Sequence, residues 1–264
     1  MSVRKVLLER DGPLAILKFN DPGSLNAMDD IMRGQFAEVM TAQLDDDSVR
    51  AVLLTGEGRA FCAGANLKNM FGQQSRGAVP DVGQSLRTYI NPTLVRMQES
   101  PKPIMAAVNG PAVGVGCGIA LAADIVLAGR SAYFFQSFIR LGVVPDGGSS
   151  WFIPRLAGQG RAAAMMMLGD KIDADTALRW GLVYKVFEDD ELPVAARSLA
   201  GQLANGPTLA YGRIKAMLRE SPASSLAAQL EREAENQALS FSSADCREGI
   251  AAFVEKRAPS FKGR

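Results

Sequence analysis

Residues 109–118 read Asn-Gly-Pro-Ala-Val-Gly-Val-Gly-Cys-Gly, and they follow directly on the apolar run Ile104–Val108. The apolar run predicts a buried strand, and the small residues after it predict a glycine-rich turn that opens a helix. Small side chains let a ligand approach the main chain, and the unpaired N–H groups of a helix start favour developing negative charge. The stretch therefore predicts a site for an anionic oxygen, or else a helix packed tightly on a strand.

A second stretch of the same kind lies upstream. Residues 59–67 read Arg-Ala-Phe-Cys-Ala-Gly-Ala-Asn-Leu and come after Ala51–Thr55, an aliphatic run that predicts another buried strand. Amides from the two stretches together would form an oxyanion hole. A dinucleotide-binding fingerprint is a competing interpretation, but Ile119 stands where its third glycine belongs. The sequence also lacks a phosphate-binding Gly-Lys-Ser/Thr loop.

The third stretch, Leu141–Trp151, places Asp146 between an apolar run and two glycines that precede an expected helix. Pro-Asp-Gly is typical of a turn, and Asp146 is also a candidate N-cap. The chain has no histidine, which excludes Ser-His-Asp and Cys-His hydrolases and histidine-bound metal sites. The acid-base catalyst must then be a carboxylate, Lys, Tyr or Cys. Asp146 is the main candidate, and the rival Cys117 is expected to be buried packing.

Around these stretches the chain alternates strands and helices before it turns mostly helical. Val3–Arg10 and Leu14–Asn20 flank an Asp-Gly-Pro turn and predict a hairpin. The later alternation predicts crossover connections and parallel strand pairing. A surface loop is expected at Gly72–Gly83, which is rich in Gly, Gln and Ser. Further strands are expected at 104–108 and 125–127, and helices near 29–44, 86–98, 161–168, 173–180, 191–205, 207–218 and 224–256 with a break at Ser242.

The composition indicates a soluble globular protein. The chain has 264 residues, 47% hydrophobic and 22% charged, which is enough for a large core. The formal net charge is +1, so no global field favours nucleic acid or an anionic membrane as partner. The sequence shows no signal peptide, transmembrane segment or zinc-ligand spacing, and its three cysteines, Cys62, Cys117 and Cys246, argue against a disulfide framework. We therefore expect a cytoplasmic protein without metal, nucleic-acid or membrane partners.

Further segments complete a recognisable pattern: Leu25-Asn26-Ala27-Met28, Ala122-Ala123-Asp124-Ile125, Asp173–Val186, Arg247-Glu248-Gly249 and Phe253–Arg257. With the three stretches above, their order resembles the crotonase superfamily of enoyl-CoA hydratases and isomerases over essentially the whole chain. The resemblance implies an α/β fold, with a crotonase-like spiral of ββα units in residues 1–200 and a helical trimerisation region in residues 201–264. It also implies a homotrimer or hexamer that acts on an acyl-CoA and needs no cofactor, because CoA is part of the substrate.

The resemblance also implies roles for particular residues. The thioester oxygen would lie between the backbone amides of Ala65 and Val115, where valine replaces the family's usual glycine. Lys256 of a neighbouring subunit is expected to reach a CoA phosphate. The residues expected to contact CoA or the acyl chain are Ala27, Ala63, Asn66 (in place of the usual aspartate), Leu67, Lys68, Gly118, Phe135, Phe138, Ile139 and Trp151.

The chain departs from the family at the catalytic carboxylates. A hydratase of this family uses two glutamates, and Gly118 and Phe138 stand at their places. Ordinary β-hydration is therefore poorly supported. The isomerase branches carry a single acid where Asp146 stands, and Pro-Asp-Gly-Gly before Trp151 and Pro154-Arg155 is similar to the ring 1,2-epoxyphenylacetyl-CoA isomerases of phenylacetate breakdown.

Asp146 is accordingly predicted to remove a proton from the acyl chain and to return it at another carbon, which makes the protein an isomerase. Apolar surroundings supplied by Phe138, Leu141, Val143 and Val144 are expected to raise its pKa. Two alternatives stay open. One is an enoyl-CoA hydratase or thioester hydrolase that directs water through Asp146, and the other is a non-catalytic acyl-CoA-binding subunit.

Overall fold

The protein is described from a computed structural model, in which residues 3–68 and 81–264 are described. Most of the surface loop predicted at Gly72–Gly83 lies outside the described residues. Its last two residues, Val82 and Gly83, open the short helix α3 (Val82–Ser85), which Asp81 caps by accepting a hydrogen bond from the Gln84 N–H.

A six-stranded sheet forms the centre of the fold, in the order β1-β2-β3-β4-β6-β9. β1 and β2 form the predicted antiparallel hairpin, and each later neighbour pairs in parallel. The prediction of crossover connections is confirmed. The strands are β1 (Val6–Asp11), β2 (Leu14–Phe19), β3 (Ala51–Gly56), β4 (Ile104–Val108), β6 (Ile125–Gly129) and β9 (Lys185–Phe187).

A second, three-stranded sheet is built from the residues that follow the central strands. It consists of β5 (Pro111–Val113), β7 (Tyr133–Phe135) and β8 (Lys171–Asp173). The bridge between Cys62 and Ala112 extends it toward the first glycine-rich loop. The chain thus alternates between the sheets as it winds, which is the predicted crotonase-like spiral. The sequence predicted a turn where β5 forms, and it did not predict β8 or β9.

The predicted helices form, and identifiable caps set several of their ends. Asp29 accepts a hydrogen bond from the Met32 N–H at the start of α1, while Ser225 and Ser243 cap α11 and α12. The cap at Ser243 accounts for the predicted break. The helices besides α3 are α1 (Asp30–Asp45), α4 (Asn91–Glu99), α5 (Val115–Leu121), α6 (Ser149–Ala157), α7 (Gln159–Leu168), α8 (Ala174–Trp180), α9 (Leu192–Ala204), α10 (Thr208–Glu220), α11 (Leu226–Phe241) and α12 (Ala244–Glu255).

The central sheet is covered on both faces, and strand alternation divides its side chains between two apolar clusters. In β2, Ala15 and Leu17 join the larger cluster with α1 and α4, whereas Leu14 and Ile16 face the other way. That second face is covered by α9 through four buried residues at helical spacing, Leu192, Ala196, Ala200 and Ala204. α9 therefore packs on the sheet for four residues beyond residue 200, where the sequence analysis placed the boundary between the core domain and the helical region. That boundary stays a prediction.

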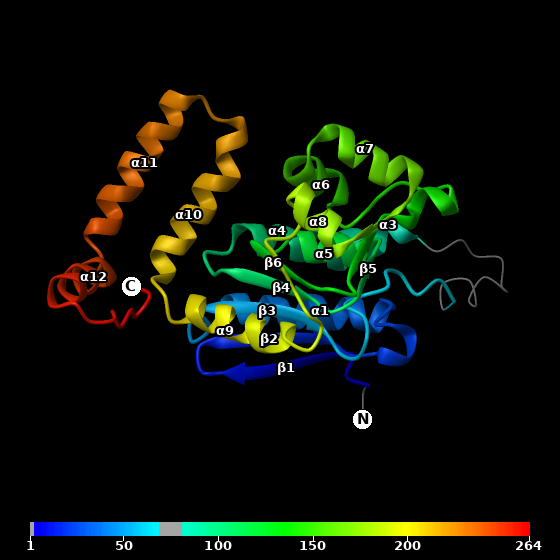
Figure 1. Cartoon of the computed structure of the whole chain (residues 1–264), viewed down its shortest axis with the longest axis horizontal. Helices are drawn as coiled ribbons and strands as arrows, with labels where there is room; N and C mark the ends of the chain where they lie inside the picture. Colours follow the sequence, from blue (N-terminus) through cyan, green and yellow to red (C-terminus); the bar gives the residue numbers. More distant parts are fainter. Residues whose placement is uncertain (1–2, 69–80) are drawn as a thin grey trace.

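The last three helices form an arm that stands beside the body of the protein (Figure 1). α10 and α11 bury none of their own residues. Arg50 at the edge of β3 fastens the base of the arm, since its guanidinium donates to Thr208 Oγ1 and to the carbonyls of Phe261 and Gly206. None of the helices among residues 3–68 and 81–264 is both long and apolar enough to cross a bilayer.

An ion pair in the junction ties α10 to the start of β6. Lys215 Nζ lies 2.9 Å from Asp124 Oδ2 and 2.7 Å from the Met97 carbonyl, and the two side chains are 10% and 24% exposed. Burial raises the pKa of Asp124 and lowers the pKa of Lys215, so each charge depends on the other. The Ala122–Ile125 segment, recognised by its sequence pattern, thus has a structural role.

We expect Lys215→Met to destabilise the protein by about 3 kcal/mol, because it leaves the Asp124 carboxylate desolvated and unpaired. The double variant Asp124→Asn, Lys215→Met should recover at least half of that loss. Urea unfolding of the three proteins checks this. Additive effects of the two substitutions would show that the pair is not coupled.

Candidate active site

The two glycine-rich loops meet along their main chains. The Cys62 N–H donates to the Pro111 carbonyl at 3.0 Å, and the Val113 N–H donates to the Cys62 carbonyl at 2.9 Å. A Cβ built on Gly64 would lie 2.9 Å from the Val113 carbonyl oxygen. The contact occurs just before Ala65 in one loop and just before Val115 in the other, so these two residues lie close together.

The amides of Ala65 and Val115 are both available as donors. Val115 is the first residue of α5, where a helix has no internal acceptor for its N–H. Ala65 lies between two paired neighbours, because the Met28 N–H donates to the Gly64 carbonyl and the Asn66 N–H donates to the Met28 carbonyl. Within the described ranges neither Ala65 nor Val115 donates a backbone hydrogen bond. Two adjacent free donors are the arrangement that an oxyanion hole requires.

The loop that begins at Asp21 supports the first of these amides. Asn26, fully buried in a left-handed conformation, donates from Nδ2 to the carbonyls of Ala60 (2.7 Å) and Glu57 (3.0 Å). Its Oδ1 accepts from the Asp21 N–H. The sequence pattern identified this segment, but it did not show that the Asn26 side chain joins two loops by hydrogen bonds. The next residue, Ala27, is also buried.

Asp146 lies in a turn and not at a helix cap. Its carbonyl accepts from the Ser149 N–H at 3.1 Å, and Gly148 is the N-cap of α6 without a side-chain cap. The N-cap interpretation is therefore wrong. One carboxylate oxygen, Oδ1, is buried and has no hydrogen-bond partner among the described residues. Burial raises the pKa of Asp146 to about 6, and the positive charge of Arg33 lowers it by a smaller amount.

The source of this burial differs from the prediction. Leu141, Val143 and Val144, expected to surround Asp146, are 52%, 51% and 81% exposed. Their strand-like apolar run was misleading, because the loop turns these side chains outward. The main chain next to Asp146 instead packs on α5.

The contact with α5 is close enough to exclude any side chain at position 118. A Cβ built on Gly118 would lie 2.1 Å from the carbonyl oxygen of Gly147. A Cβ on Gly147, at φ +59°, would lie 3.2 Å from Val115 Cα and Cγ2. The valine that replaces the family's usual glycine thus supports the turn that carries Asp146.

Both places expected for hydratase glutamates are therefore filled by other groups. The main chain of Gly147 occupies the space at Gly118. The ring of Phe138 lies 3.4 Å from a Cβ built on Gly114, just before the Val115 amide. Among the described residues, Asp146 is the candidate carboxylate that remains, and the turn that carries it packs against Val115 and Gly118.

A buried hydrogen bond closes the loop that carries Asp146. Gln136 Nε2 donates to Ser149 Oγ at 3.0 Å, and both residues are fully buried. The bond joins the end of β7 to the start of α6, so it fixes both ends of the segment between them. The sequence analysis did not identify this pair, because Gln136 lies outside the motif that contains Ser149 and the two residues are thirteen positions apart.

Arg33 is the charged residue that the sequence analysis missed. It is 8% exposed and lies next to Met32 on the buried side of α1. Its Nη1 donates to Asp30 Oδ1 at 2.7 Å and to Ser85 Oγ at 3.2 Å, and its Nη2 donates to the Met28 carbonyl at 3.2 Å. An arginine among the apolar positions of a predicted helix was the available signal.

Cys117 does not compete with Asp146 as a base. It is fully buried, and burial raises the pKa of its thiol to about 12. The thiol therefore stays protonated at neutral pH, and the expectation of buried packing is confirmed. Cys62 has the same pKa for the same reason.

Other predicted binding residues lie in three places. The Ala63 N–H donates to the Leu25 carbonyl two residues before the free Ala65 amide, and the loop continues into exposed Leu67 and Lys68. Trp151 is 39% exposed on α6, with the Arg155 guanidinium 4.0 Å from its ring centroid. Lys256 ends α12 on the arm, far from α5 in the same chain (Figure 1).

The raised pKa of Asp146 predicts a pH-dependent cost in stability. The carboxyl has a pKa of about 6 in the folded protein and 3.8 in the unfolded chain. The stability that protonated Asp146 contributes is therefore fully present below pH 3.8 and is lost as the pH rises through 6. Asp146→Asn should thus stabilise the protein by up to about 3 kcal/mol at pH 8 and by little at pH 4. Urea unfolding at both pH values checks this, and an equal gain at both would contradict it.

The fold, with its two glycine-rich loops, is that of the crotonase class, and comparisons with known proteins identify the chain as an acyl-CoA enzyme of that class. The sequence profile of the Enoyl-CoA hydratase/isomerase family matches residues 9–264. The chain is 42% identical over 248 residues to the 1,2-epoxyphenylacetyl-CoA isomerase of Escherichia coli (strain K12), with 94% of each chain covered. It is 35% identical over 260 residues to the 2,3-dehydroadipyl-CoA hydratase of the same organism, with 98% and 99% covered.

A solved structure shows the same similarity in three dimensions. The crystal structure of an enoyl-CoA hydratase from Polaromonas sp. JS666 matches with a TM-score of 0.88 at 31% identity, covering 97% of this chain and 99% of that one. The protein belongs to the enoyl-CoA hydratase/isomerase family and is an enzyme of that family. The resemblance predicted from the sequence is confirmed.

Proposed function

We propose that the protein is an acyl-CoA isomerase that uses Asp146 as its single acid-base group. In a 3-enoyl-CoA, the Asp146 carboxylate removes a proton from C2, and the electron pair forms a dienolate. The Ala65 and Val115 amides hold the thioester oxygen, and one such donor is typically worth about 10²–10³ in rate. Asp146 then returns the proton to C4. The double bond moves from the 3,4 to the 2,3 position with no change in mass and no need for a metal or redox cofactor.

The observation that carries this proposal is that neither place expected for a hydratase glutamate holds a carboxylate, and that position 118 has no room for a side chain. The carbonyl oxygen of Gly147 lies 2.1 Å from a Cβ built on Gly118, and an aromatic ring stands at Phe138. A hydratase needs one group to activate water and another to protonate carbon. Asp146 can do these two tasks only in sequence, which suits a proton that leaves one carbon and returns to another.

A ring 1,2-epoxide of phenylacetyl-CoA is the second candidate substrate. The relative of that name is 42% identical over 94% of the chain. Opening of the strained ring would also be an isomerisation through an enolate held by the two amides. The pathway would then be phenylacetate breakdown.

Product analysis tests the reaction class. We expect a 3-enoyl-CoA to give a conjugated 2-enoyl thioester, seen by its absorbance, with unchanged mass. Gain of one water by a 2-enoyl-CoA would instead support a hydratase, and release of free CoA would support a thioester hydrolase. Tight binding of enoyl-CoA without any product would support a non-catalytic binding subunit.

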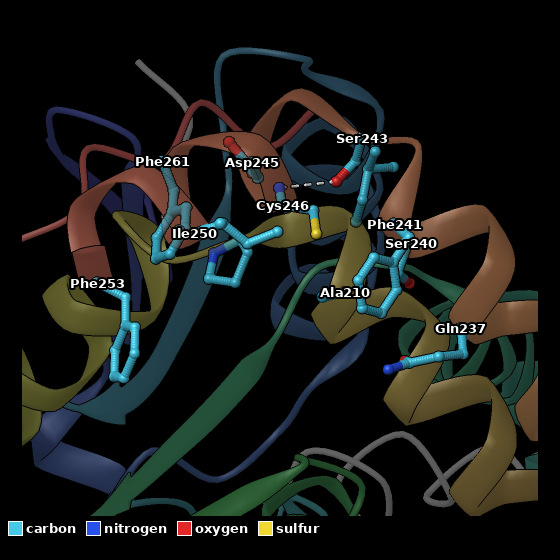
Figure 2. A pocket seen from close by; sticks show the side chains of 13 residues that line it. Ala210, Gln237, Ser240, Phe241, Ser243, Asp245, Cys246, Ile250, Phe253 and Phe261 are labelled. Atoms are coloured by element: carbon cyan, nitrogen blue, oxygen red, sulfur yellow. Dashed lines mark hydrogen bonds between the residues drawn. The ribbon is translucent and has the colours of Figure 1, made fainter.

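We further propose that the arm forms a homotrimer or a hexamer. A pocket of about 420 Å³ lies among α10, α11, α12 and the tail. Figure 2 shows its apolar side chains, with Phe253, Ile250 and Phe261 on one side and Phe241 on the other. Phe241 and Phe253 are 59% and 85% exposed, which is costly for a monomer in water. Light scattering of the purified protein tests the assembly. Assembly would also let Lys256 of one subunit reach CoA on another.

A further inference from the structure

The Ala65 amide is held in place from a neighbouring segment. Met28 pairs with both sides of it, because the Met28 N–H donates to the Gly64 carbonyl at 2.7 Å and the Met28 carbonyl accepts from the Asn66 N–H at 3.0 Å. The plane of the Ala65 amide is thus fixed by where Met28 lies. Met28 itself is fully buried.

A single guanidinium fixes the Met28 carbonyl from the other side. Arg33 Nη2 donates to that carbonyl at 3.2 Å, while Arg33 Nη1 is held by Asp30 and Ser85. The guanidinium therefore connects the start of α1, the end of α3 and the bridge that carries Ala65. Its planar fork suits several fixed acceptors at once, whereas an ammonium is a single point of charge.

The same guanidinium is the charge that acts on Asp146. Arg33 favours the ionised form and lowers the pKa of Asp146, against the larger effect of burial. Asp30 is paired with Arg33, while Cys62 and Cys117 both have pKa values near 12 and stay neutral. Arg33 thus combines an electrostatic effect on Asp146 with a hydrogen bond to the Met28 carbonyl that supports the Ala65 amide.

We propose that Arg33 is a positioning residue for the reaction, which fixes the Ala65 amide through Met28 and keeps Asp146 available as a base. This inference rests on the proposed function. Arg33 need not touch the substrate, and its effect should therefore appear in kcat and in the pH profile and not in KM.

The test is steady-state kinetics of 3-enoyl-CoA isomerisation by Arg33→Met and Arg33→Lys across pH 5 to 9. Arg33→Met should lower kcat by about 10- to 100-fold, since a displaced oxyanion donor loses most of its value, with KM within about 2-fold. Its acid limb of kcat/KM should move to higher pH. Arg33→Lys retains the charge, so its limb should stay at the wild-type position while kcat falls. Arg179→Met is the control, because within residues 3–68 and 81–264 the Arg179 side chain donates a hydrogen bond only to Thr176 of its own helix.

Wild-type kcat and an unmoved limb in folded Arg33→Met would overturn the inference, as would a loss confined to KM. If Arg33→Met does not fold, Arg33→Lys decides, since a fall in kcat of at least 5-fold supports positioning and a wild-type kcat opposes it. Asp146→Asn is measured in parallel. Full activity in that variant would refute the proposed function itself, whereas an inactive Asp146→Asn with unaffected Arg33 variants would refute only the role of Arg33.

Discussion

Asp146→Asn should reduce kcat for 3-enoyl-CoA isomerisation by about 10³- to 10⁴-fold, at the upper end of what general acid-base catalysis contributes. Asparagine has nearly the same shape, so the turn from Asp146 to Ser149 and the packing on α5 should persist. It cannot accept the C2 proton. Binding of the CoA moiety should change little, because no predicted contact with CoA involves the carboxylate.

Absorbance of the conjugated thioester measures this effect. Asp170→Asn is a suitable control, since the Asp170 side chain is 68% exposed and its salt bridge to Arg140 is long, at 3.8 Å. The control should retain wild-type kcat. An Asp146→Asn variant with more than about a tenth of wild-type kcat would show that another group moves the proton.

Gly118→Ala should reduce kcat by at least about 100-fold, which is the typical cost of a 1 Å displacement in an active site. The added methyl would overlap the Gly147 carbonyl oxygen, which lies 2.1 Å from the Cβ position. The Gly147 carbonyl is part of the main chain and residue 118 is part of α5, so neither can rotate away as a side chain would. The turn must therefore move, and Asp146 moves with it. For the same reason Gly118→Glu should not create a hydratase.

Gly160→Ala is the matched control, because a Cβ on Gly160 in α7 meets no atom within 4 Å. It should retain activity and be slightly more stable, because alanine has a higher helix propensity than glycine. Measuring kcat and the urea midpoint for both variants separates a local displacement from general unfolding. A Gly118→Ala enzyme with wild-type kcat would mean that the turn can shift without disturbing the base.

Much of the fold could be predicted because its determinants are local. The β-branched and aliphatic runs at Ile104–Val108 and Ala51–Thr55 gave strands in the predicted places, and the helix break predicted near Ser242 coincides with the cap at Ser243. β8 and β9 were missed because three-residue strands have too little periodicity of their own to be recognised. They form through pairing with β7 and β6, which is a tertiary effect.

The site was only partly predictable, for a related reason. The glycine-rich loops and Asp146 were chosen from their small residues, from the absence of histidine and from the family resemblance, and their catalytic roles stay predictions. Local patterns pointed to Asn26 and Arg33 without showing what their side chains bind, because those hydrogen bonds depend on how the loops fold together. The bond from Gln136 to Ser149 joins residues thirteen positions apart, and no local pattern predicts such a pairing. The exposure of Val143 and Val144 was mispredicted because an apolar run does not show which way a loop turns its side chains.

The central claim is that ionised Asp146 is the base of an isomerase, and the pH dependence of kcat/KM on a 3-enoyl-CoA tests it most directly. Burial raises the pKa of Asp146 to about 6, and kcat/KM reports groups of the free enzyme. We predict that kcat/KM is constant above pH 7, falls tenfold per unit below about pH 6, and loses this limb in the residual activity of Asp146→Asn. A flat profile through pH 5, or the same limb in Asp146→Asn, would contradict the assignment.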